Sequence, residues 1–270
     1  MTETSKLLAI LAHPDDESMG IGGTLAKYAA EGVDTFLVCA TRGERGWWES
    51  EGPNPGLEGV AKVRTQELEN AGNVLGLKEI HFLGYIDGDL DQADPKEAIA
   101  KIVTHIRRIQ PQVVVTFAHD GSYGHPDHVA ISQFTTAAVV CAADGSYRDS
   151  WNQSPHRVSK LYYFVDSEEI AELFMKYLGA IEFPVDDLVR GEAPWKDWMI
   201  TTRIDLSSWW KPAWDAIRCH KSQLPSLGPL LALSEDEIRQ LMTLQGTFYR
   251  AMSTVNGGRK RETDLFEGLR

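Results

Sequence analysis

The sequence predicts an α/β fold in which a mostly parallel sheet is flanked by helices and followed by an elaborated C-terminal third. Two observations support this prediction. Short, continuously apolar segments are typical of strands buried on both faces, and here they alternate repeatedly with segments of helical periodicity. The chain also shows no internal repeat and no clean linker. We therefore expect a single domain over residues 1–270, with a core at about 6–142 and an elaboration at about 143–270.

The predicted core is a series of strand–helix units. Strands are expected at residues 6–12, 35–40, 79–83 and 112–117, and helices at residues 19–30, 60–75, 95–109 and 126–142. One stripe of the second helix collects Val60, Leu68, Ala71 and Leu75. Pro95 suits the first turn of the third helix. The long loop at 41–59, which contains Trp47 and Trp48, is expected to be functional or mobile, because long irregular connections are seldom idle.

The C-terminal third follows a looser pattern. A strand is expected at residues 160–165 and a further one at 201–206, with helices at 208–224 and 235–244. Residues 247–253 suit either a strand or a helix. The tail at 256–270 mixes charges with Leu265 and Phe266, which we expect to anchor it to the rest of the domain.

Composition excludes several classes of protein. The formal net charge of -12 argues against binding to nucleic acid or to anionic membranes, which requires a basic surface. There is no apolar run long enough to span a membrane, and the N-terminal residues do not resemble a signal peptide. The three cysteines are widely spaced, as suits a reducing compartment. We expect a cytoplasmic enzyme or binding protein, and the sequence leaves a homo-oligomer open.

Residues that bind metals or transfer protons gather at two corners of the predicted fold. His13, Asp15 and Asp16 follow the first strand, and the segment from His125 to His128 follows the fourth. In open parallel sheets, ligands bind at the carboxyl ends of the strands. Both corners lie on that edge, so the topology is expected to bring them together.

The residue types at these corners predict a hydrolytic zinc site. A catalytic zinc uses three protein ligands and keeps one position open for water. We expect His13, Asp16 and His128 to be those ligands, although a lone inward histidine is more often a core residue. Asp15 is the candidate general base, and the alternative for this residue is helix capping.

The second corner supplies the remaining expected roles. His125 is the candidate cation that stabilises an oxyanion or protonates the leaving amine. Asp127 is expected to orient His125 and so to support catalysis, and helix capping is again the alternative. Glu17 is expected to be structural, holding His13 or the start of the helix. A nucleotide site at the glycines of 20–23 is rejected, because acidic groups stand between them and the strand and would repel a pyrophosphate.

The two motifs, His13-Pro14-Asp15-Asp16-Glu17 and Gly124-His125-Pro126-Asp127-His128, resemble those of the LmbE-like, PIG-L family of zinc-dependent N-deacetylases. The resemblance extends from residue 6 to about residue 142 and implies a Rossmann-like sheet. It also implies Zn²⁺ held by the three ligands named above, with Asp15 as base. The implied reaction is removal of an N-acetyl group from a small molecule that contains N-acetylglucosamine. Another divalent metal is compatible with this ligand set.

The resemblance further implies that Arg64, Asp87 and Tyr123 bind the substrate, and that His220 belongs to a late motif near the pocket. The alternatives are an ion pair of Arg64 with Glu67 or another acid, and ordinary packing for Tyr123 and His220. Two other functions stay open. One is an amidase of the same family that acts on a thiol conjugate or a non-carbohydrate amide, and the other is a non-catalytic protein that binds a sugar or a metal.

Overall fold

The computed structural model describes residues 4–48, 51–149, 151–180, 182–185, 188–191, 193–255 and 260–270, and all structural statements concern these residues. Their main element is one seven-stranded sheet with the strand order β3-β2-β1-β4-β5-β9-β8. Its strands are β1 (Lys6–Leu11), β2 (Asp34–Thr41), β3 (Glu79–Tyr85), β4 (Val113–Phe117), β5 (Lys160–Phe164), β8 (Thr202–Arg203) and β9 (Thr247–Ser253). The first five strands in the order from β3 to β5 are parallel, and β9 and β8 extend the sheet in antiparallel fashion. The predicted α/β fold with a mostly parallel sheet is confirmed.

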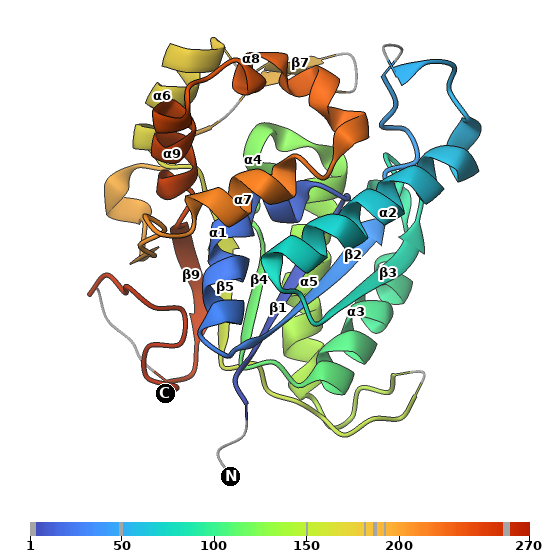
Figure 1. Ribbon diagram of the computed structural model, residues 1–270. Coiled ribbons are helices and arrows are strands. Elements are labelled where there is room, and N and C mark those ends of the chain that lie inside the picture. Colours follow the sequence, from blue (N-terminus) through green and yellow to red (C-terminus); the bar gives the residue numbers. More distant parts are fainter. Residues whose placement is uncertain are drawn as a thin grey trace.

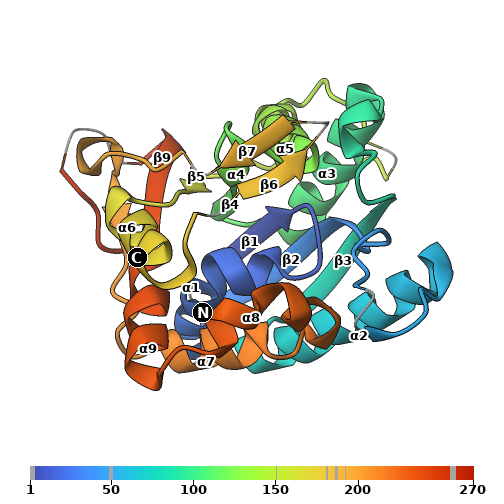
Figure 2. The ribbon, with the colours of Figure 1, turned by 90° about the horizontal axis from the view of Figure 1, so that it is seen from above.

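Helices cover both faces of this sheet (Figures 1 and 2). One face carries α1 (Asp16–Ala30), α2 (Gly56–Leu75) and α7 (Trp210–Ile217), and the other carries α3 (Pro95–Ile109) and α5 (Pro126–Ala143). The core lies between these layers, and Leu7, Leu8, Ile10 and Leu11 of β1 are fully buried. Burial on both faces explains why β1 reads as a continuous apolar run in the sequence.

The C-terminal third adds a second set of elements beside α1 and above the carboxyl edge of the sheet. These are α6 (Glu168–Leu178), the hairpin of β6 (Glu182–Val185) and β7 (Leu188–Gly191), α8 (Gly228–Leu231) and α9 (Glu235–Leu244). Short turns lie at α4 (Gly121–Gly124), Leu90–Gln92, Asp197–Met199 and Lys221–Leu227. No helix among the described residues is long and apolar enough to cross a lipid bilayer.

The structure corrects several predicted boundaries. The helix predicted at 19–30 begins at Asp16, so the acidic corner forms its first turn. The helix predicted at 208–224 ends at Ile217, and a 3₁₀ turn that contains Pro225 follows. Residues 247–253 form a strand, because they pair with β5. The predicted strand at 201–206 is limited to Thr202–Arg203. Helix α6 and the β6–β7 hairpin were not predicted from the sequence.

The C-terminal tail is integrated into the domain. Leu265 and Phe266 are fully buried, as expected of its two anchors. Glu262 is also buried and accepts hydrogen bonds from Lys160 (2.8 Å) and Tyr162 (2.6 Å) on β5. The beginning of the predicted tail, residues 256–259, lies outside the described residues.

Candidate active site at the carboxyl edge of the sheet

The two acidic corners meet because β1 and β4 are adjacent parallel strands. Nδ1 of His13 lies 3.2 Å from Nε2 of His128 and 3.7 Å from Oδ2 of Asp16. Oδ1 of Asp16 lies 3.4 Å from Nε2 of His128. All three side chains are buried. The structure therefore brings together the three residues that were expected to bind metal.

Hydrogen bonds fix how these three side chains face one another. Nε2 of His13 contacts Oδ2 of Asp127 at 3.0 Å, and Nδ1 of His128 contacts the carbonyl oxygen of Gly121 at 3.2 Å. Oδ2 of Asp16 accepts from the backbone N–H groups of Ala12 and His13. One nitrogen of each ring is thus held by the protein, and the other nitrogen faces the shared centre.

The centre has a strongly negative environment. Burial by itself would lower the pKa of His13, but its hydrogen bonds to Asp127 and Asp87 outweigh this effect and hold the pKa well above its ordinary value. Burial would raise the pKa of Asp16, but the neighbouring His128 and His13 outweigh it and lower the pKa to about 2. This combination of buried carboxylates and imidazoles favours a positive charge at the centre.

Asp15 lies at the N-cap of α1, yet its side chain makes no capping hydrogen bond to the described residues. Its backbone has the unusual φ of 117°, and its carboxylate lies 3.0 Å from Nη2 of Arg64. The capping alternative for this side chain is therefore wrong. Burial, reinforced by Asp16 and opposed by Arg64, raises the pKa of Asp15 to about 6.

His125 caps α5, and Asp127 holds its ring, as expected, but through the backbone N–H group and not through the carboxylate. Nδ1 of His125 accepts a hydrogen bond from the backbone N–H of Asp127 at 3.2 Å. The Asp127 carboxylate instead accepts from the N–H groups of Gly88 (2.7 Å) and Leu90 (3.1 Å) and contacts His13. The physical reason is that these backbone donors and His13 satisfy the hydrogen-bonding capacity of the buried carboxylate.

The protonation state of His125 also differs from the expected one, which was a cation. Burial, together with the nearby His13 and His128, lowers the pKa of His125 to about 4. The ring is therefore neutral near pH 7. Because its Nδ1 is an acceptor, the proton of the neutral ring is on Nε2, which can donate to a ligand. Donor atoms of His13, His125 and His128 all lie within 4.8 Å of one another.

Arg64 and Asp87 lie at the site, where their side chains contact other residues of the protein. Nη1 of Arg64 donates to the carbonyl oxygen of Gly43 at 3.0 Å, and Nη2 donates to Pro14 and pairs with Asp15. The ion-pair alternative for Arg64 thus holds with Asp15 as partner. Oδ1 of Asp87 lies 3.1 Å from Nε2 of His13. Burial would raise the pKa of Asp87, but its hydrogen bond to His13 outweighs this effect and lowers the pKa well below its ordinary value.

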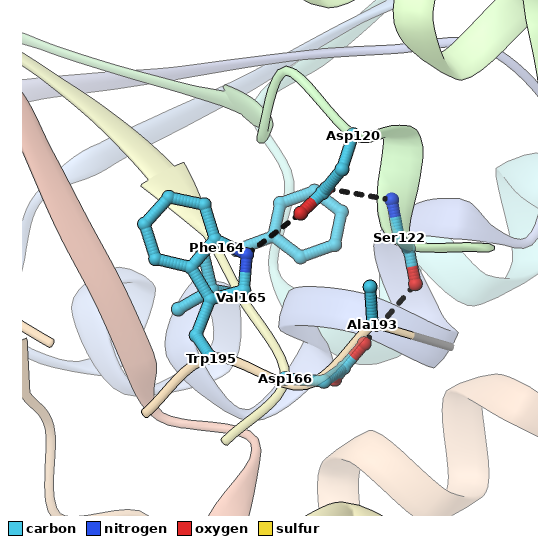
Figure 3. Close-up of a pocket in the computed structure, with 7 residues that line it drawn as sticks. All are labelled: Asp120, Ser122, Phe164, Val165, Asp166, Ala193 and Trp195. Atoms are coloured by element: carbon cyan, nitrogen blue, oxygen red, sulfur yellow. Dashed lines mark hydrogen bonds between the residues drawn. The ribbon is translucent and has the colours of Figure 1, made fainter. Parts of the chain in front are cut away.

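The turn that precedes His125 is anchored through Asp120 and Ser122, which contact Trp195 and Asp166 (Figure 3). Oδ2 of Asp120 accepts from the indole N–H of Trp195 at 2.7 Å, and the hydroxyl of Ser122 donates to Asp166 at 3.1 Å. Ser122 has a φ of 67°, a left-handed conformation that these contacts stabilise. The ring of Tyr123 lies 5.3 Å from that of His128. Tyr123 therefore borders the site.

The sequence analysis gave the C-terminal third only a minor part in the site. A cavity of about 50 Å³ beside Asp15 is lined by Met19 of α1 and by Ile217, His220, Gln223, Ser226 and Leu227. Gln223 also donates to the carbonyl oxygen of Gly46 (2.9 Å) and contacts the indole N–H of Trp48. The only sequence signal for this wall was the motif around His220.

The chain is similar in sequence to a known family of enzymes. The family model PIG-L, described as GlcNAc-PI de-N-acetylase, matches residues 8–139. A 1D-myo-inositol 2-acetamido-2-deoxy-alpha-D-glucopyranoside deacetylase of Kineococcus radiotolerans is 33% identical, over 100% of this chain and 84% of the relative. A deacetylase of the same name from Streptomyces avermitilis is 35% identical, over 98% of this chain and 97% of the relative. The chain belongs to the PIG-L family. Its family membership and these full-length relatives show that it is a deacetylase.

Several solved structures share the fold of this chain. The conserved protein TT1542 of Thermus thermophilus superposes with a TM-score of 0.65 at 26% identity, over 93% of this chain and 96% of that one. GalB, the 4-carboxy-2-hydroxymuconate hydratase of Pseudomonas putida, superposes with a TM-score of 0.66 at 17% identity, over 94% and 99%. Since a hydratase shares the architecture, the fold alone does not determine the reaction.

Proposed function

We propose that this PIG-L family deacetylase is a metal-dependent hydrolase that removes the N-acetyl group from an N-acetylglucosamine-containing small molecule. The observation that carries the proposal is the convergence of His13, Asp16 and His128 directly beside Asp15. The full-length relatives are named for a glucosaminide linked to inositol, so a glycosyl-inositol is the first substrate to test.

The donor set suits a zinc ion. Ligand atoms about 2.0–2.1 Å from a tetrahedral zinc are about 3.3 Å apart. Nδ1 of His13 and Nε2 of His128 are 3.2 Å apart, and the Asp16 carboxylate approaches them with different oxygens, Oδ2 at 3.7 Å from His13 and Oδ1 at 3.4 Å from His128. Zinc in such a site polarises a carbonyl and makes water a nucleophile near neutral pH. Other divalent ions also bind histidine and carboxylate ligands, so the proposal covers them as alternatives.

Asp15 is proposed as the general base. Its carboxylate does not cap the helix, and Arg64 holds it in place. With a pKa of about 6, it is ionised at neutral pH yet basic enough to accept a proton from the attacking water. The protonated carboxyl can then deliver that proton to the leaving nitrogen.

His125 is proposed to stabilise the oxyanion of the tetrahedral intermediate as a neutral donor. Its capping hydrogen bond uses Nδ1, so the Nε2–H group of the neutral ring is the one that can donate to a ligand. A preorganised donor of this kind stabilises developing negative charge without the cost of reorienting water. Tyr123, on the adjacent turn, is proposed to contact the substrate.

Asp127, Asp87 and Arg64 are proposed to hold the catalytic side chains in position. Asp127 and Asp87 both contact Nε2 of His13, which fixes the ring so that Nδ1 faces the metal centre. Arg64 and Asp87 offer little exposed surface. We therefore propose that they hold Asp15 and His13, and that contacts to the substrate are secondary for both.

The decisive experiment measures release of free amine from a panel of substrates. The panel includes an N-acetylglucosaminyl-inositol, simpler N-acetylglucosaminides, a thiol-conjugate amide and an N-acetylated amine without a sugar. The proposal expects turnover of the glucosaminides that is abolished by a chelator and restored by added Zn²⁺. Turnover of only the other amides would replace the proposed substrate, and the absence of any turnover would contradict the proposed hydrolysis.

A further inference from the structure

The backbone of Asp15 adopts a conformation that needs external support. Its φ of 117° and ψ of -26° lie in a region that residues with a side chain rarely occupy. Its carbonyl oxygen accepts from the N–H groups of Ser18 (3.0 Å) and Met19 (2.8 Å), which begins the helix. These bonds do not hold its N–H group, so the other side of the strained residue must be fixed by a different contact.

Glu17 provides that contact. Its Oε2 accepts a hydrogen bond from the backbone N–H of Asp15 at 3.0 Å. The carboxylate is completely buried, and its other oxygen accepts from the hydroxyl of Ser18 and contacts Nε2 of His220 at 2.8 Å. Glu17 was expected to hold His13 or the helix start. It holds the helix start, because Asp15 is the N-cap of α1, and it also links Asp15 to a residue of the C-terminal third.

The position of His220 is fixed by its surroundings. It follows α7, which packs against α1 (Figure 2), and only 1% of its surface is exposed. Two residues later, the N–H and the hydroxyl of Ser222 both donate to Glu67 of α2 at 2.7 Å. Burial would lower the pKa of His220, but Glu17 outweighs this effect and raises it. The His220 ring therefore supplies the hydrogen-bond partner that a buried carboxylate requires.

The cavity beside Asp15 adds a second observation. His220 lines this cavity, and its Nδ1 is buried without a hydrogen-bond partner among the described residues. The imidazole is therefore oriented through Nε2 alone, by Glu17 and Ser18. Its position depends on Glu17 as much as the position of Glu17 depends on it.

We propose that Glu17 and His220 form a positioning pair that fixes the strained backbone of Asp15, and through it the direction of the Asp15 carboxylate. In this proposal the pair acts through Asp15 and not through contact with the substrate. This inference rests on the proposed role of Asp15 as general base. It gives the C-terminal third a direct part in catalysis, because His220 comes from 203 residues beyond Glu17.

The test compares His220→Ala and His220→Gln in the full-length enzyme. The alanine variant removes the donor to Glu17, and we expect kcat to fall at least tenfold with KM within twofold and the metal content unchanged. Glutamine keeps an N–H donor for Glu17, so it is expected to restore most of kcat. Glu17→Gln keeps an acceptor for Asp15 but loses the charge, and an intermediate kcat is expected.

Gln245→Ala is the matched control. Gln245 also ties the C-terminal third to α1, through a 2.6 Å hydrogen bond to the carbonyl oxygen of Met19, but it does not contact Asp15. A similar loss of kcat per bound metal in this control, or unchanged kcat in His220→Ala, would overturn the proposal. Should His220→Ala fail to fold, kcat of Glu17→Gln is compared with kcat of the control. Unchanged kcat in Glu17→Gln, or an equal loss in both variants, would then overturn the proposal.

Asp15→Asn separates the two levels of inference. If Asp15→Asn is inactive and His220→Ala is fully active, only the positioning pair is wrong. If Asp15→Asn is itself active, the proposed base is wrong, and the positioning pair is overturned with it.

Discussion

Oδ2 of Asp127 lies 3.0 Å from Nε2 of His13, although 114 residues separate the two in the sequence. The same carboxylate accepts from the backbone N–H groups of Gly88 and Leu90. Three elements of the carboxyl edge therefore meet at one buried side chain: the corner after β1, the loop after β3 and the start of α5. The orientation of His13, a proposed metal ligand, therefore depends on how these three elements pack around Asp127.

This relationship predicts that Asp127→Asn weakens metal binding. An asparagine retains the shape of the side chain but cannot supply the charge that orients His13, and the loss of such a partner typically costs 10–100-fold in metal affinity. Competition titration with a zinc chelator measures the effect. Asp144→Asn, at the other end of α5, is the control and is expected to bind metal as the parent does. Equal affinity in both variants would contradict the role of Asp127.

Substitutions of His13 and Asp15 are expected to separate metal binding from proton transfer. Asp15→Ala should retain metal and lose about 10²–10⁴ in turnover, the usual contribution of a general base. His13→Ala should lose both, because a ligand is removed. Metal analysis of the purified variants and an amine-release assay test the pair together. Nearly full activity of Asp15→Ala would mean that another group takes the proton.

The pH dependence of catalysis follows from the raised pKa of Asp15. The base must be ionised, so kcat/KM is expected to fall as the pH decreases through a midpoint at or below about 6, since a bound cation lowers the pKa further. Arg64 lowers the pKa of Asp15. Arg64→Gln should therefore move this midpoint to higher pH. A profile of kcat/KM against pH for both enzymes measures the shift, and a midpoint that moved to lower pH would reverse the assigned interaction.

Much of the fold and the membership of the site could be predicted because both are encoded locally. The continuous apolar run of β1 and its acidic corner are adjacent in sequence, and the parallel topology then places them beside the corner after β4. The partners within the site could not be predicted in this way. Whether the Asp127 carboxylate turns to His13 or to His125 depends on the backbone donors of a distant loop, which no local pattern reveals.

The C-terminal third was harder to predict for a related reason. The β6–β7 hairpin is a separate two-stranded sheet, whose short strands carry too few residues for a periodic signal. Helix α6 has a clear start, since Ser167 caps it through the N–H of Ile170, but this start was missed beside the stronger strand signal of β5. Long-range contacts, such as that between Glu17 and His220, depend on how these elements pack.

The tail offers a prediction on stability. Phe266 is fully buried and its ring lies 5.3 Å from that of Tyr28, a residue of α1 that is also fully buried. Phe266→Ala should lower the free energy of unfolding by about 3–5 kcal/mol, the usual cost of removing a buried aromatic side chain. Chemical denaturation measures the change, with the half-exposed Val255→Ala as a control that should have little effect. A loss below about 1 kcal/mol in Phe266→Ala would show that the tail contributes little to the domain, whereas the expected loss would show that the tail stabilises the domain.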